Sequence, residues 1–173
     1  MSSERRRVPP PWFFRGFGTV QRTVHRLSGG RLGISRPSPD RWGQVCLMSV
    51  GRRSGKERSA ILGYHEDGAN LVTIALNGWS DAEPAWWLNL QAQPDAVVRL
   101  KDGTRPVRAR AAGGDERERL WARWRDLGER SGVAFMADID SDAAKLSREM
   151  AVVVLEPRPD SSAPEDDATK ATR

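Results

Sequence analysis

The chain has 173 residues, of which 38% are hydrophobic and 29% are charged, a composition typical of a folded globular domain rather than a disordered chain. No apolar run approaches the roughly 18 residues of a transmembrane helix, and the N-terminus shows no secretory signal. The single cysteine, Cys46, cannot form an internal disulfide, so we expect a cytoplasmic protein. The net charge of +5 is uneven, because residues 1–31 carry seven arginines against one glutamate.

Residues 1–40 are expected to form a basic N-terminal region. Its first twelve residues combine arginines with prolines, which favour an extended arm. An amphipathic helix should follow, because apolar residues recur at steps of three and four: Phe13, Phe17, Val20, Val24 and Leu27. This helix could cap the domain, or residues 12–28 could lie on an anionic membrane surface.

Residues 41–158 are expected to form the folded domain. Short apolar or alternating runs predict six strands at 45–50, 59–65, 71–76, 96–100, 105–111 and 151–155. Asp67-Gly68 and Asp102-Gly103 are tight-turn signals between consecutive strands. Because the strands are joined mainly by hairpins, the fold class is mainly β with flanking helices, built on a small antiparallel barrel.

Two helices are predicted with clear signals and a third with a weaker one. Pro84 suits a first helical position before a segment that stops at Pro94. Asp115 and Glu118 have the spacing of a capping box, and Leu120 begins an apolar face behind them. The weaker helix covers residues 141–148, and the polar tail at 159–173 is expected to be disordered.

The sequence offers few reactive side chains. With two histidines and one cysteine, it shows no metal-ligand spacing and no serine-hydrolase motif. No GxGxxG follows a predicted strand, and Asp138 and Asp140 lie in a polar stretch where solvated or helix-capping roles are expected. If the protein is an enzyme, a cofactor should supply the chemistry, and no residue is assigned as the proton donor.

The stretch SVGRRSGKERSAILG at residues 49–63 concentrates positive charge on one turn. Arg52, Arg53, Lys56 and Arg58 lie within seven positions, and Glu57 alone opposes them. Gly51 and Gly55 allow a tight turn whose backbone N–H groups can bind an anion. The turn is therefore either a phosphate site or a hairpin loop facing water; the basic arm also leaves nonspecific nucleic-acid binding open, although no recognition motif is legible.

Residues 47–94 resemble the deazaflavin-dependent nitroreductase family of actinobacteria. Gly51, Arg52, Ser54, Gly55 and Arg58 match the family pattern T-G-R-x-[ST]-G-x-x-R. Asp67-Gly68 matches the hairpin D-G, and residues 84–94 match P-x-W-x-x-N-L-x-x-x-P. The resemblance runs from about Leu27 to Pro157 and rests on the joint spacing of these motifs.

The resemblance implies a split β-barrel of the FMN-binding type that binds coenzyme F420, with FMN as the less favoured cofactor. It implies that the turn holds the phosphate and acidic tail of F420, that residues 59–62 lie beside the deazaflavin ring, and that a loop and a helix adjoin the coenzyme. The implied coenzyme-binding residues are Arg52, Arg53, Ser54, Gly55, Lys56, Arg58, Ser59, Ala60, Ile61, Leu62, Asn77, Gly78, Trp86 and Asn89.

The implied activity is hydride transfer between F420 and a small apolar acceptor of the quinone, enone or nitro class. The chain departs from the family pattern at Ile61, where proline is frequent, and in the loop at 76–79; its one tyrosine, Tyr64, lies away from the usual substrate region. The substrate wall is expected from residues 132–150, including Phe135 and Met136, and from the N-terminal segment. Two alternatives remain: an F420 carrier without catalysis, and a basic domain associated with membranes or nucleic acid that has no redox role.

Overall fold

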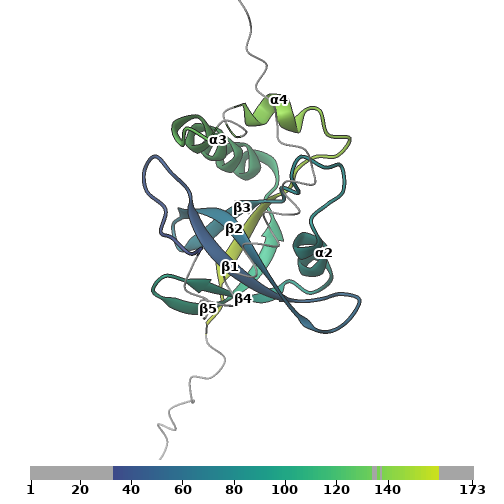
Figure 1. The fold of residues 1–173 in the computed structure, drawn as a ribbon. Helices are drawn as coiled ribbons and strands as arrows, with labels where there is room; N and C mark the ends of the chain where they lie inside the picture. The colour runs from purple at the N-terminus through teal and green to yellow at the C-terminus, as the bar shows by residue number, and fades with distance from the viewer. Residues whose placement is uncertain (1–32, 134–135, 137, 160–173) are drawn as a thin grey trace, which may run out of the picture.

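The computed structural model describes residues 33–133, 136 and 138–159, so the predicted N-terminal helix, Phe135 and the predicted tail lie outside the described residues. Six antiparallel strands form a closed barrel in the order β1-β2-β3-β6-β5-β4 (Figure 1). The strands are β1 (Gly43–Val50), β2 (Glu57–Asp67), β3 (Asn70–Ile74), β4 (Asp95–Leu100), β5 (Gly103–Ala111) and β6 (Val152–Pro157). The predicted mainly β barrel is therefore confirmed.

The predicted hairpins form as expected. Asp67 pairs with Asn70 across the turn, where Gly68 has a φ of 62° that only glycine adopts readily. Leu100 likewise pairs with Gly103 between β4 and β5. β3 ends at Ile74 rather than Leu76, because the chain leaves the sheet there in a tight turn in which the Leu76 N–H bonds to the Ile74 carbonyl.

Three helices are described: α2 (Ala85–Ala92), α3 (Gly114–Arg130) and α4 (Ile139–Ala143). Pro84 is the N-cap of α2, one position before its predicted place. The predicted capping box was wrong, because Gly113 caps α3 and Asp115 lies inside the first turn. The third helix begins earlier than predicted and is shorter, because the Asp138 side chain accepts a hydrogen bond from the Ser141 N–H and starts α4 at Ile139.

Two apolar clusters hold the helices to the barrel. The first fills the barrel with inward strand residues and receives Trp87 and Leu90 from α2. The second lies between the outer face of β3 and β6 and the helices α3 and α4, which lie together in Figure 1. Helix α2 packs against the barrel apart from α3 and α4, next to the turn between β1 and β2 (Figure 1).

Candidate functional site

The β1–β2 turn at residues 51–56 is tightly closed by backbone hydrogen bonds. The Gly51 N–H bonds to the Lys56 carbonyl, and the Ser54 and Gly55 N–H groups both bond to the Gly51 carbonyl. Gly55 has a φ of 63°, and a Cβ on Gly51 would lie 2.9 Å from the Ser54 hydroxyl oxygen. The backbone of Gly55 therefore favours glycine, and a side chain at Gly51 would crowd the Ser54 hydroxyl and, at 3.2 Å, the Lys56 carbonyl oxygen.

The cations of this turn lack the ion pairs that many other arginines of the described residues make. Arg110, Arg117, Arg119 and other surface arginines pair with carboxylates over 2.6–3.3 Å. Within the described residues, none of the four cations at 52–58 makes such an ion pair; Arg58 instead bonds to the Ser54 hydroxyl, at 3.3 Å. All four side chains are exposed, so their charge is available to an external anion.

Helix α2 positions the turn through one buried amide. The Asn89 side-chain oxygen accepts hydrogen bonds from the Arg52 backbone N–H at 3.1 Å and from the Arg52 guanidinium at 3.5 Å. Asn89 is 5% exposed, while its neighbour Trp86 is half-buried and packs against the barrel core. Of these two implied coenzyme residues, Asn89 is brought to the turn, which it reaches by bonding to the Arg52 backbone, whereas Trp86 lies against the core.

The strand residues that follow the turn divide between two faces of β2. Ser59 and Ile61 pair with Met48 and Cys46 of β1 and lie on the outer face, whereas Ala60 and Leu62 pack into the barrel core. Side-chain contact with an external ligand therefore falls to Ser59 and Ile61, with backbone contact available from the other two.

The implied loop residues Asn77 and Gly78 lie between β3 and α2. The Asn77 amide donates a hydrogen bond to the Ala82 carbonyl at 3.0 Å, which closes the loop on itself. Gly78 has a φ of 58°.

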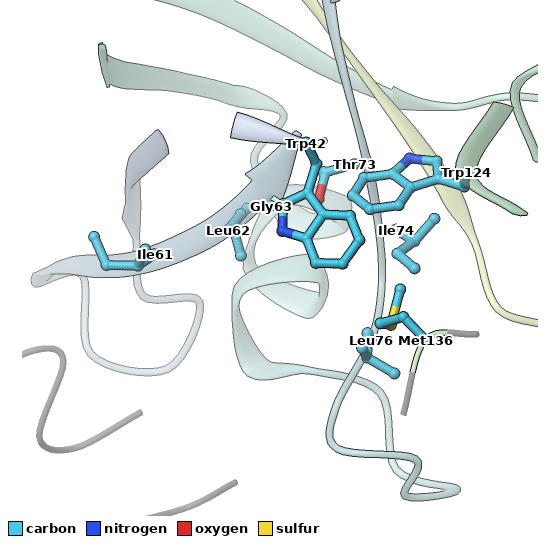
Figure 2. A pocket seen from close by; sticks show the side chains of 9 residues that line it. All are labelled: Trp42, Ile61, Leu62, Gly63, Thr73, Ile74, Leu76, Trp124 and Met136. Carbon is cyan, nitrogen blue, oxygen red and sulfur yellow. The ribbon is translucent and has the colours of Figure 1, made fainter. Parts of the chain in front are cut away.

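A pocket of about 200 Å³ opens next to Ile61, where β2 and β3 diverge (Figure 2). The two strands pair through His65 and Val72, so Gly63 and Ile74 face each other beyond the last paired residues. The walls are mostly apolar and comprise Trp42, Ile61, Leu62, Gly63, Thr73, Ile74, Leu76, Trp124 and Met136. Met136 was expected in the substrate wall, and the pocket includes it.

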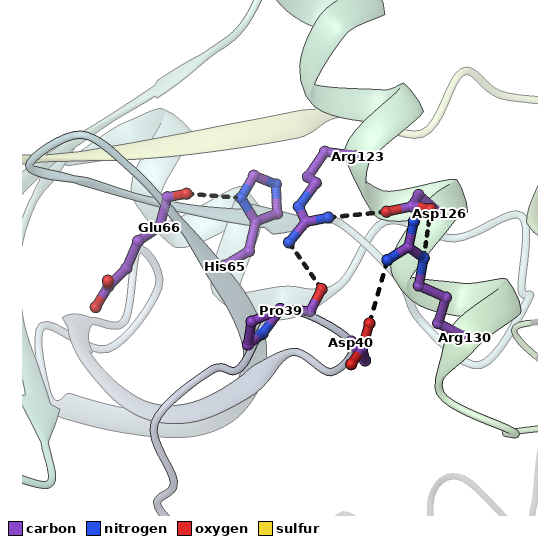
Figure 3. A network of polar contacts seen from close by, with 7 residues as sticks. All are labelled: Pro39, Asp40, His65, Glu66, Arg123, Asp126 and Arg130. Carbon is purple, nitrogen blue, oxygen red and sulfur yellow. Dashed lines mark hydrogen bonds and ion pairs between the residues drawn. The ribbon is translucent and has the colours of Figure 1, made fainter.

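Two indoles form one side of this pocket. The rings of Trp42 and Trp124 have centroids 5.9 Å apart, and both approach Gly63 so closely that a Cβ there would lie 3.1 and 3.3 Å from them. The segment before Trp42 is tied to α3, because Arg123 bonds to the Pro39 carbonyl and Arg130 pairs with Asp40 (Figure 3). Sequence reasoning missed these two tryptophans as pocket residues, although a glycine inside an apolar strand signals a close approach.

Within the described ranges, no group of three histidine, cysteine or carboxylate side chains is arranged to hold a metal ion. The site therefore consists of a cationic turn, a strand face and an apolar pocket.

Comparison with known proteins identifies the family. The F420H(2)-dependent quinone reductase family matches residues 19–157. The chain belongs to this family. It is accordingly an F420-dependent oxidoreductase, and the expected cofactor is confirmed.

Individual relatives agree with this assignment. Rv3178 of Mycobacterium tuberculosis, which carries the same family name, is 34% identical over 126 residues that cover 73% of this chain and 96% of that protein. Rv1261c of the same organism, an F420H(2)-dependent quinone reductase, is 27% identical over 44% of this chain and 50% of its own length. The solved F420-H2 dependent reductase FDR-A has a TM-score of 0.56 and 26% identity, covering 71% of this chain and 96% of that one.

The residues present suit this coenzyme. F420 carries a phosphate and an acidic tail, which match cations that have no carboxylate partner in the described structure. It also carries a flat ring, which can lie along the outer face of β2 at Ser59 and Ile61 beside them.

Proposed function

We propose that the protein transfers hydride from reduced F420 to a quinone-class acceptor, with the coenzyme phosphate and tail bound at the turn 51–58 and the deazaflavin ring along residues 59–62. The observation that carries this proposal is the group of cations without ion-pair partners in the described structure, beside an apolar pocket. Bound F420 supplies the hydride, and the protein supplies binding, orientation and exclusion of water.

The energetics favour a ligand with both an anionic and an apolar part. Each charge-assisted hydrogen bond contributes about 1.5–3 kcal/mol net. Micromolar affinity requires about 8 kcal/mol after the costs of association. Two or three bonds from Arg52, Arg53 and Arg58 supply part of that, so burial of the deazaflavin ring along residues 59–62 must supply the rest.

The pocket between Trp42 and Trp124 is the proposed acceptor site. A cavity of ~150 Å³ is large enough to bind benzene, so about 200 Å³ suits one ring or two fused rings. Indole walls favour a flat aromatic acceptor, since stacked or tilted aromatic pairs gain energy beyond burial alone.

A fluorescence titration of the protein with F420 tests coenzyme binding. We expect saturable binding at micromolar protein; a folded protein that fails to bind would reject both the enzyme and the carrier. Where F420 binds, turnover of reduced F420 against quinones, enones and nitro compounds distinguishes the two, because a carrier consumes no coenzyme with any acceptor.

A cytoplasmic location with peripheral membrane contact through residues 12–28 is a further proposal, supported by the basic amphipathic pattern there. None of the helices in the described ranges is long and apolar enough to span a membrane. Liposome flotation of the full chain and of a chain lacking residues 1–30 tests this contact, which is rejected if both float equally.

A further inference from the structure

The loop between β3 and α2 contains a turn that most sequences avoid. The Ser80 N–H bonds to the Asn77 carbonyl at 3.1 Å, and both central residues have positive φ: 58° at Gly78 and 60° at Trp79. Two successive positive φ values in a four-residue turn are typical of the mirror-image type I′ turn. Glycine adopts this conformation freely, but a bulky residue such as tryptophan does so only under strain.

Packing holds Trp79 in its strained backbone conformation. Its indole packs against the apolar cluster between the barrel and α3, where Leu76 from the same loop also packs. The indole N–H is buried and has no acceptor among the described residues. Strain of this kind persists only where the surroundings fix it, and it is concentrated at ligand-binding loops.

The side chain of Arg148 bonds to two backbone carbonyls of this loop. Its Nη2 donates to the Ala75 carbonyl at 3.1 Å and to the Ser80 carbonyl at 3.4 Å, thereby joining the two ends of the turn segment. The adjacent Ser147 N–H donates to the Asp81 carboxylate at 2.6 Å. Asp81 directly follows Ser80, so this bond also ties the loop to the segment that precedes β6.

The guanidinium of Arg148 has no carboxylate partner within the part of the chain that the structure describes, and its Nε and Nη1 are buried there without acceptors. A partly buried charge that makes no ion pair is costly to retain. Its bonds to Ala75 and Ser80 are thus the contacts that account for its position.

We propose that Arg148 is a positioning residue, which holds the Asn77–Ser80 turn in its left-handed form so that Asn77 and Gly78 are presented to the coenzyme. The inference rests on the proposed function, since Asn77 and Gly78 are among the residues that the family resemblance implies for F420 binding. Without Arg148, the strain at Trp79 favours relaxation of the turn, and the loop must be reordered each time the coenzyme binds.

The test compares three variants with the natural chain. Arg148→Gln removes the double carbonyl contact, Gly78→Ala strains the same turn through its backbone, and Gly114→Ala is a control at another left-handed glycine, with a φ of 51° and no atom within 4 Å of an added Cβ. We expect the first two to raise the F420 dissociation constant at least about fivefold, because preorganisation of the loop is lost. The control should lose stability without losing affinity.

The double variant separates positioning from general destabilisation. If Arg148 acts through the turn, Arg148→Gln combined with Gly78→Ala should weaken F420 binding little more than either change alone. Unchanged affinity in a folded Arg148→Gln protein, or fully additive losses in the double variant, would overturn the proposal. If Arg148→Gln does not fold, Arg148→Lys keeps the charge and replaces it in the same comparison.

Amide hydrogen exchange of residues 76–83 gives a readout that needs no coenzyme. Exchange should be faster in Arg148→Gln than in the natural chain, while the core strands are unchanged. A natural chain that does not bind F420 would reject the proposed function, whereas unchanged exchange in the variant would reject the role of Arg148 in the turn.

Discussion

The Asn89 side-chain oxygen accepts a hydrogen bond from the Arg52 backbone N–H at 3.1 Å, across 37 residues of sequence. This bond links α2 to the β1–β2 turn, whose four cations make no ion pair with a carboxylate in the described part of the chain. Trp87 and Leu90, on either side of Asn89, are buried in the barrel core. Because the helix is fixed by these neighbours, the amide is held in place to define the backbone of the turn.

Asn89→Ala should therefore lower both stability and coenzyme affinity. The substitution removes the bond to the Arg52 N–H, which is partly buried and of a kind that contributes about 0.5–1.5 kcal/mol net. We expect the urea midpoint to fall and the F420 dissociation constant, measured by fluorescence titration, to rise. Gln91→Ala, on the exposed face of the same helix, is the matched control and should change neither quantity.

The cations of the turn are expected to act together on the coenzyme phosphate. Arg52→Ala combined with Arg58→Ala should weaken F420 binding at least about tenfold, or about 1.4 kcal/mol. The loss should shrink as salt rises, since exposed charges are screened. A protein with Arg41→Ala and Lys101→Ala loses the same net charge elsewhere; if it weakens binding equally, the phosphate is not held at this turn.

The barrel and the turn could be predicted from sequence because their signals are local. Alternating strands, Asp-Gly turns and two glycines among cations each report on a few neighbouring residues. The start of α3 was missed because Asp115 and Glu118 imitate a capping box, while Gly113 makes the actual cap without a side chain. The acidic pattern favours an N-cap at Asp115, but the backbone of Gly113 and Gly114 places the cap two residues earlier.

The pocket could not be predicted because it depends on contacts between distant residues. Trp42, Gly63 and Trp124 meet only when β2 diverges from β3 and α3 folds across the gap. Trp124 has the spacing of an ordinary core residue on a helix. Nothing in the sequence around it shows whether its side chain fills the core or lines a pocket. The bonds from Arg148 to the Ala75 and Ser80 carbonyls could not be predicted for the same reason, since these partners lie 73 and 68 residues away in the sequence.

Gly63→Ala should impair the acceptor more than the coenzyme. The added Cβ would lie 3.1 Å from Trp42 and 3.3 Å from Trp124, so the indoles must shift and the pocket between them changes shape. We expect KM for a quinone to rise several-fold while the F420 dissociation constant stays within about twofold, because the turn is untouched. Gly113→Ala, where an added Cβ meets nothing within 4 Å, is the control. Equal losses for coenzyme and acceptor would show that the pocket is not a separate acceptor site.

His65 should make the fold sensitive to mild acid. The residue is 3% exposed, its ring packs against Trp124, and its Nδ1 lies 3.2 Å from the Glu66 carbonyl (Figure 3). Since a carbonyl only accepts, Nδ1 carries the proton, and the neutral ring has a bare Nε2 without a donor among the described residues. Burial lowers the pKa of His65 below its ordinary 6.5, and the charges of Arg123 and Arg119 lower it further, against the opposing effects of the Glu66 carbonyl and Asp67.

The sign of the pH effect follows from where the proton binds. The unfolded chain takes up a proton on this histidine near pH 6.5 and the folded chain does not, so the free energy of unfolding falls as pH drops from 7.5 to 5.5. Asp67 and Asp81 have a lowered pKa, so they affect stability only in more acidic solution, around and below their ordinary 3.8. Urea unfolding at pH 7.5, 6.5 and 5.5 should show this decline in the natural chain and a flatter profile in His65→Gln. His25 is present in both proteins, so an identical decline in the variant would assign the effect to another group.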